Sequence, residues 1–75
     1  MNPIEERIKK SGINVAKAAI YCNVSEQTIS NYIKGTRAIT MSTSLLMDEL
    51  FGLDEGTIIL EQRAWVKNQI KESAK

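Results

Sequence analysis

The sequence lacks histidine altogether and holds only one cysteine among its 75 residues. Without histidine, the chain has neither the commonest general base nor the commonest metal ligand. The lone Cys22 can form neither an intramolecular disulfide nor a zinc site, and this usage fits a reducing compartment. The sequence also contains no pairing of a nucleophile with a base and no phosphate-binding loop. We therefore expect no enzymatic activity, no metal site and no cofactor.

Long apolar runs and a strong net charge are absent too. No run approaches the roughly 20 residues of a membrane span, and the N-terminal stretch MNPIEERIKK has no apolar segment typical of a signal peptide. A hydrophobic fraction of 43% is ordinary for a folded chain, and 75 residues make one small domain. We thus expect a single domain over residues 1–75 that does not enter a membrane.

The formal net charge of +1 is unevenly distributed. Residues 1–40 carry six basic and three acidic side chains, a net charge of +3. Residues 41–75 carry four basic and six acidic side chains, a net charge of −2. This asymmetry predicts an N-terminal half that faces a polyanion and a C-terminal half that avoids it, although a solvated mixed-charge surface would look similar.

Capping signals divide the chain into helices. Residues with good N-cap side chains precede five apolar-periodic stretches, and they are Asn2, Asn14, Ser25, Thr40 and Asp54. The expected helices span about 3–10, 15–22, 26–34, 41–51 and 55–72. Gly12 and Gly52 supply left-handed ends for the first and fourth helices. The prediction is an all-α fold with four to five helices.

The stretch 16–34 is the centre of the chain. It reads as two short helices that meet at Asn23, one of the few residue types that enter the left-handed region at modest cost. In the second helix the apolar residues recur at three- and four-residue spacing, so they can bury one stripe. The other face carries only hydrogen-bonding groups and a cation, namely Gln27, Thr28, Ser30, Asn31 and Lys34.

These residues resemble the Cro/CI-like helix-turn-helix family, also called lambda-repressor-like or XRE. The resemblance covers roughly residues 4–60, and its matching pieces are Ala19, Val24-Ser25, Thr28-Ile29-Ser30 and Lys34-Gly35-Thr36-Arg37. Asn23 stands where the family usually has glycine, Val15 where glutamine is common, and Glu26 heads the second motif helix. The resemblance implies a compact lambda-repressor-like DNA-binding domain with its motif at about 15–34. Because the family usually ends near Leu60, residues 61–75 are expected to form a C-terminal helical extension of the same single domain, 1–75.

The family resemblance makes helix 26–34 the helix that enters the DNA major groove. Its first turn then points at the base edges, so Gln27, Thr28 and Asn31 are the expected readers, with Ser30 either contributing or bonding its own helix. Glutamine and asparagine can bond adenine through two hydrogen bonds, and the threonine methyl suits thymine. The candidate phosphate contacts are Lys34, Arg37, Lys17, Asn14, Thr36 and Thr40. The alternative for each residue is a solvated polar or charged side chain.

The C-terminal half holds more apolar residues than one buried stripe needs. This surplus predicts a second contact surface, for a dimer or another partner, formed by Leu46, Leu50, Trp65 and Ile58. Trp65 would equally serve by closing the core of a single chain. Cys22 is expected to be a small buried hydrophobe rather than a redox sensor. The acidic pairs at 48–49 and 54–55 are expected to be solvated or to stand at helix starts.

Taken with the family resemblance, the sequence predicts a sequence-specific DNA-binding transcriptional regulator. The expected type is a Cro-type repressor of a bacterium, phage or prophage, located in the cytoplasm of a bacterial or phage-infected host cell. It would bind a pseudo-palindromic operator in double-stranded DNA as a homodimer through helix 26–34. The alternative is an antitoxin or phage modulator that keeps the helix-turn-helix scaffold and binds a protein partner through its apolar C-terminal half.

Overall fold

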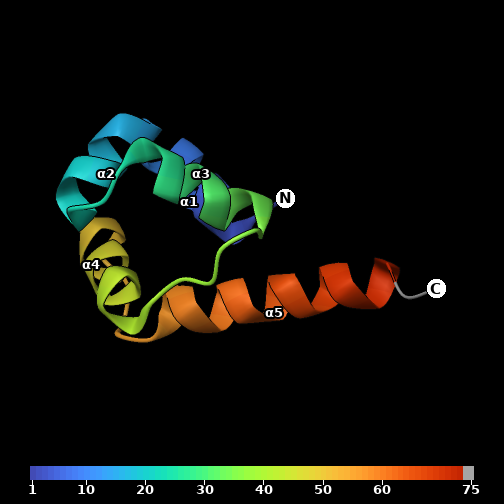
Figure 1. The fold of residues 1–75 in the computed structure, drawn as a ribbon. Helices are drawn as coiled ribbons and strands as arrows, with labels where there is room; N and C mark the ends of the chain where they lie inside the picture. The colour runs from blue at the N-terminus through green and yellow to red at the C-terminus, as the bar shows by residue number, and fades with distance from the viewer. Residues whose placement is uncertain (74–75) are drawn as a thin grey trace.

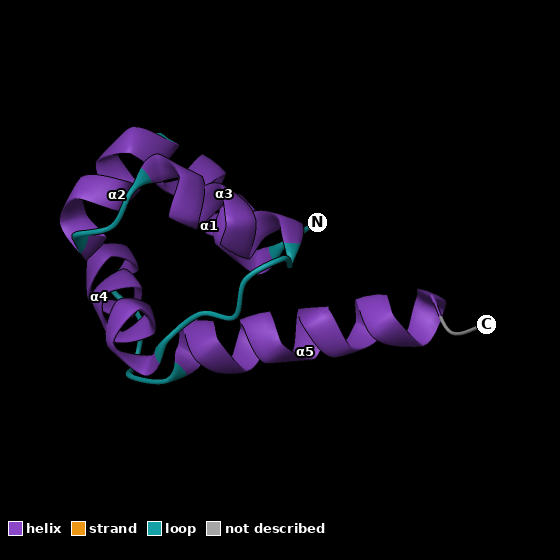
Figure 2. Cartoon of the chain, in the orientation of Figure 1, coloured by secondary structure: helices purple, strands orange, loops and turns teal. Residues whose placement is uncertain are grey.

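A computed structural model describes residues 1–73, and these form five α-helices and no strand. The helices are α1 (Pro3–Ser11), α2 (Val15–Cys22), α3 (Glu26–Lys34), α4 (Met41–Phe51) and α5 (Thr57–Ser73). Short loops connect them (Figure 2). The first four helices cluster together, whereas the C-terminal half of α5 projects past them (Figure 1). The predicted all-α fold is confirmed. No helix within residues 1–73 has both the length and the apolar character needed to cross a membrane.

Four of the five predicted N-caps are confirmed. The side chain of Asn2 accepts the backbone N–H groups of Ile4 and Glu5 at the start of α1. Asn14, Ser25 and Thr40 each accept the N–H three residues later. Asn23 enters the left-handed region at the bend between α2 and α3, with φ of 56°. Helix starts and ends therefore follow local hydrogen bonding, as expected from the sequence.

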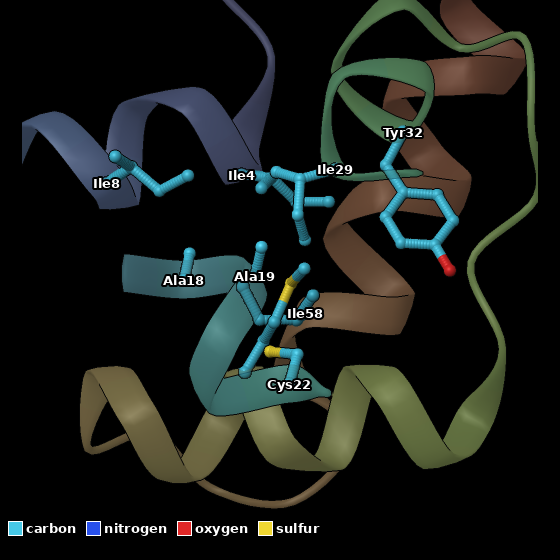
Figure 3. Packing of buried hydrophobic residues seen from close by; sticks show 9 residues of the cluster. Ile4, Ile8, Ala18, Ala19, Cys22, Ile29, Tyr32 and Ile58 are labelled. Atoms are coloured by element: carbon cyan, nitrogen blue, oxygen red, sulfur yellow. The ribbon is translucent and has the colours of Figure 1, made fainter. Parts of the chain in front are cut away.

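The core lies where α1, α2 and α3 meet α4 and the start of α5. Ile4, Ile8, Ile29 and Tyr32 are among its buried side chains (Figure 3). Ala18 and Ala19 are buried as well, and their small side chains let α2 pack closely against its neighbours. This core fixes the angle between α2 and α3, the two helices of the motif.

Cys22 lies in the same core, buried from solvent. Burial raises the pKa of its thiol, which keeps the sulfur protonated and unreactive. It packs as a small hydrophobe, as expected from the sequence. Within residues 1–73, no three cysteine, histidine or acidic side chains lie close enough together to hold a metal ion.

The start of α5 differs from the prediction. The helix begins at Thr57, two residues later than expected. The predicted cap by the Asp54 side chain is wrong, because Asp54 accepts the N–H and the hydroxyl of Thr57 through its backbone carbonyl instead. The capping carboxylate belongs to Asp48, which is only 1% exposed. It accepts the N–H of Gly56 at 2.8 Å and that of Ile58 at 2.9 Å. Asp48 is thus a buried bridge from α4 to α5, not a solvated charge.

Three further polar interactions fix α5 against the rest of the domain. The buried Gln62 side chain accepts from the Asn2 amide at 3.0 Å and donates to the Tyr32 carbonyl at 2.7 Å. On another side of α5, Arg7 forms an ion pair with Glu61 at 2.7 Å. These contacts hold α5 beside the start of α1 and the end of α3.

Candidate nucleic-acid interface

The face of α3 opposite the core is polar. Ile29 and Tyr32 point inward and are buried. Gln27 is exposed on the outer side, and the other three predicted base readers, Thr28, Ser30 and Asn31, are partly exposed. The structure therefore places all four on solvent-accessible parts of one short helix.

Gln27 and Asn31 form a pair one helical turn apart. The Nε2 atom of Gln27 donates to Oδ1 of Asn31 at 3.0 Å. Among residues 1–73, Oε1 of Gln27 and the amide nitrogen of Asn31 form no further hydrogen bond, so an acceptor and several donors lie side by side at the surface. Adenine presents the complementary donor and acceptor in the major groove. The pair has the chemistry needed to read a base edge.

The neighbouring hydroxyl groups differ in their availability. The Oγ1 atom of Thr28 lies 2.9 Å from Oγ of Ser25, which also accepts the Thr28 N–H. This contact fixes the Thr28 side chain at the first turn of α3. The Ser30 hydroxyl forms no bond to its own helix in the part of the chain that the structure describes, so it is available to a ligand.

The candidate phosphate contacts fall into two groups. Lys17, Lys34 and Arg37 are exposed, and none of them forms an ion pair within residues 1–73. Lys17 lies in the first turn of α2, where the helix dipole also favours an anion. Lys17 lies near the start of the motif in sequence, and Lys34 and Arg37 lie at its end.

The neutral candidates are mostly engaged inside the chain. The Thr36 hydroxyl donates to the Asn31 carbonyl, and the Thr40 hydroxyl donates to Oγ1 of Thr43 at 2.9 Å. Neither presents its proton to solvent in this conformation. Asn14 uses its side-chain oxygen to cap α2, which leaves its amide N–H₂ group as the available neutral donor for a phosphate.

The predicted partner surface is partly inside the domain. Ile58 is fully buried in the core, so its side chain offers nothing to a second chain. Leu46 and Leu50 are half-buried against that core. The large apolar side chains that are exposed were not among the predicted partner residues, and they are chiefly Ile20, Met41, Leu60 and Ile70.

Trp65 packs on its own chain. Its ring lies against the turn after α3, because a Cβ built on Gly35 would stand 2.9 Å from Cζ3 of that ring. Trp65 is half-buried there. It therefore supports the turn that carries Arg37, whichever further contacts its exposed edge makes.

Replacing Gly35 with alanine tests this packing. Gly35 has φ of 79°, so alanine meets left-handed strain of about 1–2 kcal/mol as well as the ring of Trp65. Gly52→Ala is the matched control, since Gly52 has φ of 69° but, among residues 1–73, no atom within 4 Å of the added Cβ. We expect Gly35→Ala to lower the free energy of unfolding by about 1 kcal/mol more than Gly52→Ala. Urea titration, followed by the fluorescence of Trp65, measures the free energy of unfolding of both variants. Equal losses would show that the ring does not pack on the turn.

A small helical domain that exposes a polar, cation-flanked helix after a tight turn belongs to the DNA-binding helix-turn-helix class. A helix-turn-helix family model matches residues 4–58, and the chain belongs to this XRE or lambda-repressor-like family. No curated protein and no solved structure matches the chain. The matched region ends at Ile58, so nearly all of α5 lies beyond it.

Proposed function

We propose that this protein is a sequence-specific transcriptional repressor of Cro type that reads an operator through α3. The observation that carries the proposal is the exposed Gln27–Asn31 pair, on the face of α3 opposite the core. Bases are distinguished by such donor and acceptor groups in the major groove, whereas phosphate contacts set the position of the protein. Lys17, Lys34 and Arg37 would supply that positioning.

The repressor is proposed to act as a dimer on DNA. One chain with a few phosphate contacts binds weakly at physiological salt, because counterion release makes the affinity fall steeply as salt rises. Two chains double the contacts and place two copies of α3 in successive major grooves, about 34–36 Å apart. The contact between chains is proposed to use exposed apolar side chains such as Met41, Leu60 and Ile70. Occupancy of the operator would then exclude polymerase.

Selection of bound duplexes from a random library tests this function. We expect enrichment of a site with two-fold symmetry whose half-sites lie about one helical turn apart. Sedimentation equilibrium on the enriched duplex should show two protein chains bound. A single chain per duplex would refute the dimer. If nothing is enriched and only salt-sensitive binding remains, the motif serves as a scaffold, and a protein partner becomes the ligand to seek.

A further inference from the structure

The outer face of α5 carries a stripe of positive charge. Arg63, Lys67 and Lys71 follow one another at four-residue spacing and are all exposed. At about 100° per residue, they fall within an arc of roughly 80° around the helix. Glu61 and Glu72 lie more than about 100° from Lys67 around the same helix, and Glu61 is already paired with Arg7. The helix therefore separates its charges by face.

This stripe adjoins the candidate DNA interface. Arg63 and Lys67 line a surface groove of about 370 Å³ together with Arg37 and Thr36 from the turn after α3. Figure 1 shows the segment that follows α3 running between α3 and α5. Within residues 1–73, no carboxylate lines this groove, and neither Arg63 nor Lys67 forms an ion pair. Three like charges thus converge on one groove with no anion from the protein.

We propose that the basic stripe of α5, Arg63, Lys67 and Lys71, binds backbone phosphates of the same DNA that α3 reads. The proposal rests on the proposed function, and it adds a contact surface outside the matched family region 4–58. From residue 63 to residue 71 the helix rises about 12 Å. Since one DNA strand carries a phosphate about every 3.4 Å along its axis, the stripe is long enough to meet about three of them.

The stripe also changes the interpretation of the charge asymmetry. The net charge of −2 in residues 41–75 predicts that this half avoids DNA. Two of its carboxylates are occupied within the chain, however, because Asp48 is buried as a helix cap and Glu61 is paired with Arg7. The three stripe cations of α5 are exposed, and Arg63 and Lys67 line the same groove as Arg37. Local position, not the sum over a half-chain, decides what this surface attracts.

The double variant Arg63→Gln/Lys67→Gln tests the stripe on the enriched duplex. The slope of log affinity against log salt, measured between about 50 and 200 mM, should decrease in magnitude by about 2 for each bound chain, and the affinity should fall. The sequence enriched from the library should stay the same, because phosphate contacts carry no sequence information. The matched control is Lys9→Gln/Lys10→Gln, which removes the same charge from α1 and should leave the slope nearly unchanged.

Each outcome decides the proposal. A slope equal to that of the unaltered protein, or an equal decrease in the control, would refute the phosphate site while leaving the proposed function intact. Failure of the unaltered protein to bind any duplex would overturn both. Should the double variant melt at a lower temperature, Lys71→Gln on the projecting part of α5 gives the same test, with an expected slope change of about 1 per chain.

Discussion

Replacing Asp48 with alanine is expected to lower the melting temperature by roughly 10–25 °C. The carboxylate is buried and accepts two backbone N–H groups at the start of α5. Alanine leaves the buried N–H of Ile58 and the part-buried N–H of Gly56 without their acceptor, at a cost of about 2–4 kcal/mol. A domain of fewer than about 80 residues rarely has more than 3–5 kcal/mol of stability. Much of the variant should therefore be unfolded near 37 °C, as measured by circular dichroism during heating.

Two comparison variants separate the cap from the loss of a charge. Glu49→Ala removes the neighbouring carboxylate, which is exposed and, within residues 1–73, accepts only the Tyr21 hydroxyl. This change should alter the free energy of unfolding by no more than about 0.5 kcal/mol. Asp48→Asn keeps one acceptor oxygen, so its melting temperature should lie between those of Asp48→Ala and Glu49→Ala. A melting temperature for Asp48→Ala close to that of Glu49→Ala would show that the carboxylate does not hold α5.

The boundaries of the first four helices were predictable because the decisive contacts are local. An N-cap bonds an N–H only two or three residues away, so Asn2, Asn14, Ser25 and Thr40 could be recognised from neighbouring residues alone. The same holds for the left-handed residue at the bend between α2 and α3. The polar outer face of α3 followed from helical periodicity, since the apolar stripe fixes where the remaining residues must point.

The contacts around α5 were not predictable because they join residues far apart in sequence. The Asp48 carboxylate accepts backbone N–H groups 8 and 10 residues further along the chain. The Gln62 side chain joins Asn2, near the start of the chain, to the Tyr32 carbonyl near the end of α3. Periodicity assigns such side chains to solvent. In α4 the buried positions include Thr43, Ser44 and Asp48, while Leu45 is exposed. A prediction from the apolar side chains alone therefore misplaces the buried face of α4.

The proposed base-reading pair, Gln27 and Asn31, and the basic stripe of α5 also differ in whether their contacts are local. Gln27 and Asn31 belong to one helix turn, so residue spacing brings them together. The basic stripe becomes a candidate phosphate site only because Arg37, which follows α3, lines the same groove. The hydrogen bond from Gln62 to the Tyr32 carbonyl that fixes α5 there joins residues far apart in sequence. The net charge summed over residues 41–75 hid this stripe, because the sum also includes carboxylates that lie elsewhere in the domain.

Gln27→Ala is expected to weaken operator binding by roughly 30-fold to 10⁴-fold. One good two-bond contact to a base discriminates by about 1–3 kcal/mol, and a dimer loses it in both half-sites. The enriched sequence should lose its preference at one position in each half-site, and the salt slope should be unchanged because no phosphate contact is removed. Gln69→Ala, an exposed glutamine on α5 outside the basic stripe, is the matched control and should bind like the unaltered protein.

The bond between Gln27 and Asn31 makes a sharper prediction about how the two residues act. Because the Gln27 amide donates to Asn31 at 3.0 Å, removing either residue also frees the other from the orientation in which it meets the base. The losses should therefore not add: the double variant Gln27→Ala/Asn31→Ala should lose less affinity than the two single losses combined, by at least about 0.5 kcal/mol. The measurement is a double-mutant cycle: the unaltered protein, the two single variants and the double variant are each titrated against the same duplex at equilibrium. Strict additivity would mean that each residue contacts its own base independently, and the pairing seen in α3 would then be replaced when DNA binds.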